Sequence, residues 1–195
     1  MKILNTRGFA VSAIMGSLSF VLMLLAFSLP FLPWFLEFDI SDLPALITSF
    51  AFGPLYGVLV CLIKNLLHLL VTRSLMVGEF SNFILGSVFV VVAGLIYKKN
   101  KSRASAFLGS LLGAFIMALF SVISNYFLVY PAYAALYMPY DTILGLYKAV
   151  LPSVNNLLQA LLIFNLPFTF IKGLFDVAIC MAVYKKLSPI LKRYY

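Results

Sequence analysis

Charged side chains are scarce in this sequence. Only 10% of its 195 residues are charged, and acids are the rarer sign, with 6 Asp and Glu against 14 Lys and Arg. Hydrophobic residues make up 64% of the chain, and no polar stretch is long enough for a soluble module. Such a composition excludes an ordinary water-soluble fold. We therefore predict one transmembrane domain over residues 1–195.

The motifs of catalysis and of metal binding are also missing. The sequence contains no GxxxxGK[ST], no GxSxG and no HExxH, so it shows no means of hydrolysing a nucleotide. Its two cysteines, Cys61 and Cys180, lie inside apolar runs without a CxxC pair or a neighbouring His, which argues against a disulfide framework and a zinc site. We predict no catalytic residues, no metal and no cofactor.

The net charge of +8 is arranged to orient a membrane protein, and it argues against nucleic-acid binding. The basic residues do not form a stripe with aromatic neighbours. By the positive-inside rule, clusters of Lys and Arg at the ends of apolar segments face the cytoplasm. Both termini are therefore predicted to be cytoplasmic, in a multi-pass membrane protein. The three clusters, which contain no acid, are Lys2 and Arg7, then Lys98, Lys99, Lys101 and Arg103, then Lys185, Lys186, Lys192 and Arg193.

The apolar stretches predict an all-α fold, a six-helix transmembrane bundle with a short second helix. Four crossings fit between the first and second basic clusters, and two between the second and third. The first stretch also resembles a signal peptide, but its length favours a retained helix. The predicted helices run about 9–29, 44–52, 55–72, 80–97, 104–130 and 166–184.

The second segment is too short to span a bilayer. Its nine residues rise about 14 Å as a helix, against a hydrocarbon core of about 30 Å. The loop over residues 31–43 must therefore dip into the bundle, and irregular backbone is tolerated there only where protein buries it or it lines a cavity. This predicts an outward-facing pocket with the loop as a lid, for which Phe35, Phe38 and Asp42 are candidates. The aromatic residues also fit a simple interfacial belt.

Prolines interrupt residues 131–165, at Pro131, Pro139 and Pro152, and Pro167 follows. Since proline breaks a helix interior, we predict an external loop with interfacial helical pieces that help to roof the pocket.

Ionisable residues within the apolar segments mark functional positions. Counted back from Lys185, Asp176 lies about 14 Å and Lys172 about 20 Å into the membrane, while Lys64 lies about 15 Å from Pro54. We predict an interhelical Lys64–Asp176 ion pair, which would leave Lys172 free to face the pocket. His68 is interpreted as a helix-packing donor.

Taken in order, six motifs resemble the substrate-binding S components of energy-coupling factor (ECF) transporters, and the riboflavin-specific members in particular. The likeness covers about residues 8–190. It implies a six-helix subunit of a prokaryotic cell membrane that binds riboflavin as its transported ligand at the outer side. It also implies docking on a transmembrane coupling subunit that two ATPase subunits drive. The motifs are EFDISDLPAL (37–46), FGPLYG (52–57), IKNLLHLL (63–70), GEFSNF (78–83), NY (125–126) and PFTFIKG (167–173).

The resemblance also implies site residues. Asn125 and Lys172 match polar groups that meet the flavin ring, and Glu79 matches the external loop beside the lid. Thr169 stands where the family usually has Asn, a loss for which Asn165 could compensate. The implied substrate-binding set is Asp39, Leu43, Glu79, Asn125, Thr169 and Lys172. The implied docking face is the small residues Gly8, Ser12, Ala13, Gly16 and Ser17, whose spacing of four equally fits packing within the bundle.

Three alternatives remain open on the sequence. The first is an S component for another vitamin or for flavin mononucleotide. The second is a stand-alone secondary transporter in which Lys172 and Asp176 relay protons or ions. The third is a structural membrane protein whose buried charges only hold helices together.

Overall fold

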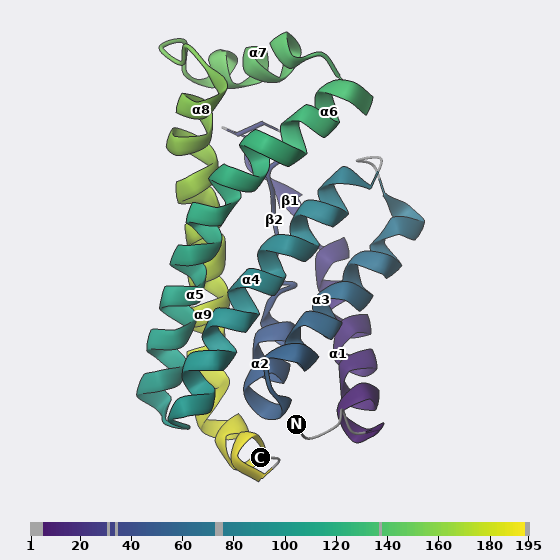
Figure 1. The fold of residues 1–195 in the computed structure, drawn as a ribbon, viewed down its shortest axis with the longest axis vertical. Helices are drawn as coiled ribbons and strands as arrows, with labels where there is room; N and C mark the ends of the chain where they lie inside the picture. The colour runs from purple at the N-terminus through teal and green to yellow at the C-terminus, as the bar shows by residue number, and fades with distance from the viewer. Residues whose placement is uncertain (1–5, 31, 34, 73–75, 137, 194–195) are drawn as a thin grey trace.

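The computed structural model describes residues 6–30, 32–33, 35–72, 76–136 and 138–193. Long helices lie side by side along most of the molecule (Figure 1). Within these described ranges, five helical stretches are long and apolar enough to cross a membrane: Thr6–Leu24, Pro54–Val71, Val77–Lys99, Arg103–Leu136 and Leu157–Lys186. Large apolar side chains such as Ile14, Leu55, Leu108 and Phe127 are exposed along these helices, as a lipid-facing surface requires.

The elements follow the chain in a simple order. Helix α1 (Thr6–Leu24) leads through a small ribbon of strands β1 (Phe27–Ser28) and β2 (Glu37–Phe38) to α2 (Leu43–Phe52), α3 (Pro54–His68) and the 3₁₀ turn η1 (Leu69–Val71). Helices α4 (Val77–Lys99) and α5 (Arg103–Ser124) follow. The chain then forms η2 (Asn125–Val129), α6 (Tyr130–Leu136), α7 (Tyr140–Val150), α8 (Leu157–Ala160), η3 (Leu161–Asn165) and α9 (Leu166–Arg193).

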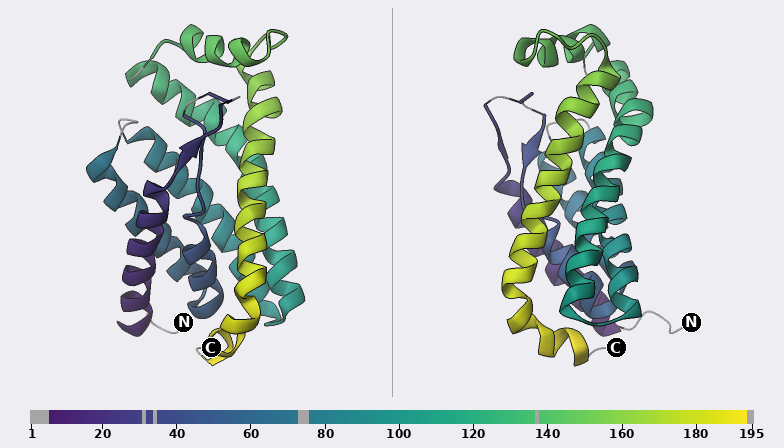
Figure 2. Two further views of the ribbon diagram at one scale, coloured as in Figure 1. Left: turned by 180° about the vertical axis from the view of Figure 1, so that it is seen from behind. Right: turned by 90° about the vertical axis from the view of Figure 1, so that its left-hand side faces the viewer.

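The start of α1, the α4–α5 connection and the end of α9 lie at the same end of the bundle (Figure 1). These places adjoin the three basic clusters of the sequence, so the positive charge gathers at one end. We call the opposite end, which α7 crosses, the outer end (Figure 2).

Pro131, which we expected to end a helix, lies instead within a long helical stretch, and so does Pro167. Pro131 and Pro167 each follow a π-helical stretch, η2 and η3. The wider π turn accommodates the missing N–H and the bulk of the proline ring without ending the helix. Residues 131–136 and 157–165 therefore extend two long helices, and only the middle of the predicted external loop, with α7, lies across the outer end.

The short helix α2 is buried at the centre of the bundle. Ala45, Leu46 and Phe50 are fully buried in a core to which α3, α4, α5 and α9 also contribute. Gly53 separates α2 from α3 with φ 109°, a conformation that favours glycine, and Pro54 begins α3. Because protein surrounds α2, it need not span the bilayer.

The segment between α1 and α2 forms an antiparallel ribbon. Phe27 pairs with Phe38 and Ser28 with Glu37. The ribbon lies toward the outer end and leads directly into α2 (Figure 2). A second cluster of buried residues, built by α6, α7 and α8 with the side chain of Phe35 packed on it, lies at this end.

Candidate functional site

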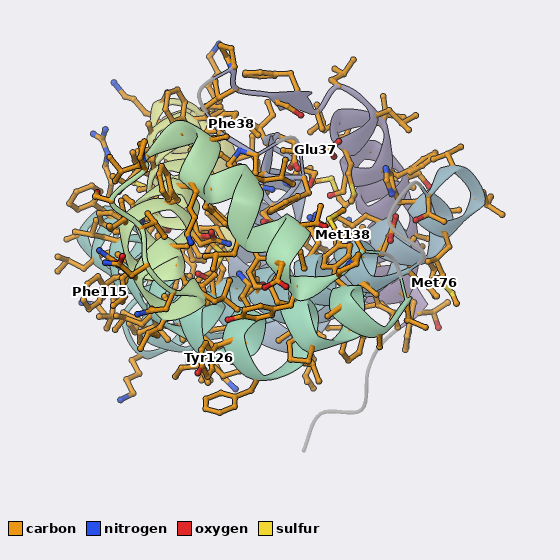
Figure 3. All side chains as sticks on the ribbon, turned by 90° about the horizontal axis from the view of Figure 1, so that it is seen from above. Glu37, Phe38, Met76, Phe115, Tyr126 and Met138 are labelled. Carbon is orange, nitrogen blue, oxygen red and sulfur yellow. The ribbon has the colours of Figure 1, made fainter. Side chains whose placement is uncertain are left out.

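A cavity of about 390 Å³ lies between the ribbon segment and the outer halves of the helices. This volume falls in the range of small-molecule sites, about 300–1,000 Å³. Helices α1, α3, α4, α5, α6 and α9, with η1, η2 and η3, line it together with residues of the ribbon segment. Figure 3 looks down on this end of the bundle, which α7 crosses.

Five of the six predicted substrate-binding residues line the cavity. They come from separate elements: Asp39 from the ribbon segment, Glu79 from α4, Asn125 from η2, and Thr169 and Lys172 from α9. On α9 a spacing of three or four residues places side chains on one helix face, and Asn165 of η3, one turn earlier, also lines the cavity.

Leu43 is the exception, because it packs against the central core at the start of α2 and does not line the cavity. Among the lid candidates, Phe35 and Asp42 line the cavity but Phe38 does not. Successive strand residues point to opposite sides, and Glu37 and Asp39 take the cavity side. Phe38 therefore packs outside, with its ring centroid 5.6 Å from that of Phe27 and 5.1 Å from that of Phe175.

Two ion pairs, one fully buried and one partly buried, tie the ribbon segment to the helices. Lys172 Nζ on α9 lies 2.8 Å from Asp39 Oδ2, and Lys64 Nζ on α3 lies 2.5 Å from Asp42 Oδ1. Lys64 also donates to Ser41 Oγ at 2.8 Å. The Lys64 side chain is fully buried and that of Lys172 is 12% exposed. Both carboxylates that hold the lysines therefore come from the segment that covers the cavity.

The predicted Lys64–Asp176 ion pair is wrong. Lys64 pairs with Asp42, and neither carboxyl oxygen of Asp176 has a hydrogen-bond partner among the residues that the structure describes. Lys172 is not free either, because it pairs with Asp39. Depth along a helix axis placed Lys64 level with Asp176, but the ribbon segment delivers Asp42 to the same level. Because residue 86 on α4 is a glycine, it leaves room for the Asp42 carboxylate, since a Cβ at this position would lie 2.6 Å from Asp42 Oδ1.

Asp39 is ionised at neutral pH. Burial by itself would raise the pKa of its carboxyl, but the ammonium groups of Lys172 and Lys64 more than offset this, and hydrogen bonds from Lys172 and Ser41 add to their effect. The pKa of Asp39 is lowered to about 2 as a result. The Ser41 backbone N–H donates to Asp39 Oδ1 at 2.8 Å, in a local turn that fixes the carboxylate.

Other polar groups around the cavity are also paired. His68 Nδ1 lies 2.8 Å from Glu79 Oε1, so this histidine links α3 to α4 as a packing residue. Tyr130, Tyr147 and Asn165 form a closed triangle of hydrogen bonds of 2.5, 2.6 and 3.1 Å. The triangle uses one donor and one acceptor site of the Asn165 amide, which leaves its second N–H and second lone pair to compensate for Thr169.

An aromatic group at the outer end was missed by our site prediction. Phe35 contacts Tyr130, Tyr133 and Tyr147, with ring centroids 5.9, 6.3 and 5.9 Å apart. Tyr130 and Tyr133 line the cavity. The concentration of tyrosines between residues 130 and 147 was the available signal, and it became informative only once α6 was known to continue α5.

The small residues of α1 divide into two faces. Gly8, Ser12 and Gly16 are buried against α3, where a Cβ on Gly16 would lie 2.6 Å from the Ile63 side chain. Ala13 and Ser17 are exposed. Three members of the predicted docking face are therefore occupied within the bundle, as close helix packing allows, and two remain accessible.

The arrangement suits binding rather than catalysis. Aromatic and apolar walls surround a few placed amide, hydroxyl, carboxylate and ammonium groups. No group of three or more His, Cys, Asp or Glu able to hold a metal ion occurs within the described part of the chain.

Comparison with known proteins identifies close similarities over almost the whole chain. Residues 7–184 match the model of the family "ECF transporter, substrate-specific component". The chain is 34% identical to the riboflavin transporter RibU of Staphylococcus aureus (strain TCH60), over 97% of this chain and 94% of that protein. It is also 34% identical to the riboflavin transporter FmnP of Bacillus subtilis (strain 168), over 95% and 94% of the two chains.

A solved structure supports the same relationship. The structure described as "Structure and mechanism of the S component of a bacterial ECF transporter" superposes with a TM-score of 0.75 at 30% identity, over 97% of this chain and 100% of that chain. This match confirms the predicted all-helical membrane fold. The family and these relatives are transport proteins, which agrees with the prediction that the chain is not an enzyme.

Proposed function

The chain belongs to the ECF transporter substrate-specific component family, and on that premise we propose that it captures riboflavin from outside a prokaryotic cell. Its termini lie in the cytoplasm and its cavity faces outward. The observation that carries the proposal is the cavity of about 390 Å³ in a chain 34% identical to riboflavin transporters. Five of the residues that the motifs implied for the ligand converge on it.

The lining residues suit the two chemically different parts of riboflavin. Its flat ring system needs apolar and aromatic walls, which Met117, Phe168 and Tyr130 supply. Its carbonyl and imide edge needs hydrogen-bond partners, a role that we assign to Asn125, Thr169 and Lys172. The ribityl hydroxyls then face polar groups nearer the opening, with Glu79 among them.

Lys172 can serve the ligand without leaving Asp39. An ammonium group has three donors, and the hydrogen bond to Asp39 at 2.8 Å uses one of them. The ligand's carbonyl oxygen takes another, so the ion pair orients the donor that recognises the ring. Asp39 thereby acts on the ligand through Lys172, while Phe35, Phe38 and Asp42 hold the ribbon segment as the lid.

Delivery of the vitamin requires partners. We propose that the chain docks on a transmembrane coupling subunit that two ATPase subunits drive, through the accessible face of α1 that contains Ala13 and Ser17. Gly8, Ser12 and Gly16 support that face from inside by letting α1 approach α3 closely.

Quenching of riboflavin fluorescence by the full chain, purified in mild detergent, tests the proposal. Riboflavin should bind at or below micromolar concentration, and flavin mononucleotide and an unrelated vitamin should compete weakly. Lys172→Ala and Asn125→Ala should each weaken binding by about 10-fold to 100-fold, as expected for a lost hydrogen bond to a buried ligand group. Lys148→Ala removes the same charge from an exposed position on α7 and should bind normally. Absence of quenching by the folded wild-type chain would overturn the assignment of the ligand.

A further inference from the structure

A second concave surface lies on the outside of the bundle, on parts of α5 and α9 nearer the basic end than their cavity-lining residues. It is a groove of about 680 Å³ between these two helices. Among its lining residues only Arg103 is charged, and the others are apolar or small. They are Arg103, Ala104, Phe107 and Leu111 of α5, and Leu174, Val177, Ala178 and Met181 of α9.

The groove has a basic mouth at the end of the bundle that carries the basic clusters. Arg103 is the first residue of α5 and its side chain is exposed. On α9, Lys185 follows Met181 by four residues and Ala178 by seven, so helical spacing continues the groove face to this exposed lysine. Two cations therefore flank the same end of one apolar groove.

No acidic residue that could neutralise Arg103 or Lys185 lies close to either of them in the sequence. No Asp or Glu occurs between residues 80 and 140, or after Asp176. The start of α5 adds the partial positive charge of a helix N-terminus. The groove thus combines an apolar floor at membrane depth with an uncompensated positive rim at the level of the headgroups.

We propose that this groove binds one anionic phospholipid of the inner leaflet. The lipid phosphate lies between Arg103 and Lys185, and one acyl chain lies along Phe107, Leu111 and Met181. An acyl chain matches the apolar lining, and the net negative charge of the headgroup matches the rim. Because the groove joins the two helices that carry Asn125 and Lys172, a bound lipid also holds together the two sides of the cavity.

Native mass spectrometry of the purified full chain, with lipids added to detergent, measures the occupancy. We expect one molecule of phosphatidylglycerol per chain, bound about 30-fold more tightly than phosphatidylcholine, since each juxtamembrane cation contributes roughly fivefold. Inorganic phosphate at the same concentration should not compete, which separates a membrane lipid from a free anion. Equal binding of the two lipids, or effective competition by phosphate, would overturn the proposal.

Two pairs of variants locate the site. The double variant Arg103→Gln, Lys185→Gln should lose the preference for phosphatidylglycerol, whereas the matched Lys98→Gln, Lys186→Gln removes two exposed charges from the same end and should keep it. Ala178→Phe fills the groove and should reduce binding of both lipids at least 10-fold, while Ala10→Phe on exposed α1 should not. Should Ala178→Phe fail to fold, Ala178→Leu provides the same test. Retention of the lipid preference by the Arg103, Lys185 variant would refute the assignment.

Discussion

Replacing Asp42 by Asn is expected to destabilise the bundle strongly, while the same change at Asp176 is not. Asp42 is the carboxylate that neutralises the fully buried Lys64 ammonium, at 2.5 Å. Asp176 is equally buried, but neither of its oxygens has a hydrogen-bond partner in the described part of the chain. Both substitutions replace a buried carboxylate by an amide, but only Asp42→Asn leaves a buried ammonium group without its carboxylate partner.

The size of the difference follows from the contacts of Lys64. Asp42→Asn leaves a buried ammonium with the Asn carbonyl and the Ser41 hydroxyl as acceptors. Removing one partner of a buried ion pair costs about 3–5 kcal/mol, and the retained carbonyl places this case near about 3 kcal/mol. For a chain of this size that corresponds to a fall of roughly 6–12 °C in the unfolding midpoint. Asp176→Asn should change stability by less than about 1 kcal/mol, or raise it.

Thermal unfolding of the ligand-free protein in one detergent compares the variants, and a third substitution tests the pairing directly. Lys64→Met added to Asp42→Asn removes both charges, and replacing a whole buried ion pair is often close to neutral. The double variant should therefore unfold at a higher temperature than Asp42→Asn alone. If Lys64→Met rescued Asp176→Asn but not Asp42→Asn, the pairing described above would be refuted.

Three further predictions concern the lid, α1 and the outer end. The pKa of Asp39 is about 2 in the folded protein, below its ordinary 3.8, so its ionised form contributes about 2 kcal/mol of stability. This contribution is complete above pH 3.8 and is lost as the pH falls toward 2. The unfolding midpoints of wild type and Asp39→Asn should therefore converge only in that acid range, and a constant gap down to pH 2 would contradict this. Gly16→Leu forces a side chain into Ile63 and should lower the free energy of unfolding by at least about 1–3 kcal/mol. Ala13→Leu, on the exposed face of α1, should leave the unfolding midpoint unchanged but weaken co-purification with a coupling subunit. Tyr147→Phe opens the hydrogen-bonded triangle and should lower stability by about 1–3 kcal/mol in chemical unfolding; an unchanged midpoint would show that the triangle adds nothing.

Local signals in the sequence were sufficient for part of the fold. The shortness of residues 44–52 and the break at Gly53 and Pro54 are properties of neighbouring residues, and they indicate the short second helix that the structure contains. The polar residues of the cavity were reached through family motifs, since Asn125 and Thr169 carry no local mark of a binding site.

Other features depend on the directions in which side chains point, which counting residues along the sequence does not give. Helical rise gives the depth of Lys64 but not the side toward which it points, so Asp176 was chosen where Asp42 is the partner. Proline at 131 and 167 normally stops a helix, and only the preceding π stretches let both helices continue. Phe38 is a predicted lid residue whose side chain points away from the cavity, a direction that could not be predicted because strand alternation within a two-residue ribbon cannot be read from the sequence.

The two ion pairs of the ribbon segment differ in burial, and this makes its attachment asymmetric. Lys64–Asp42 lies at the entrance to α2 with no exposed lysine surface, whereas Lys172 of the other pair is 12% exposed. Water reaches the second pair first, so that pair breaks at lower cost. We therefore expect the ribbon segment to open as a flap that stays attached at Asp42 and separates first at Asp39. A ligand that takes another donor of Lys172 would contact the Asp39 end of the ribbon segment alone, while the Lys64–Asp42 pair would keep the segment aligned.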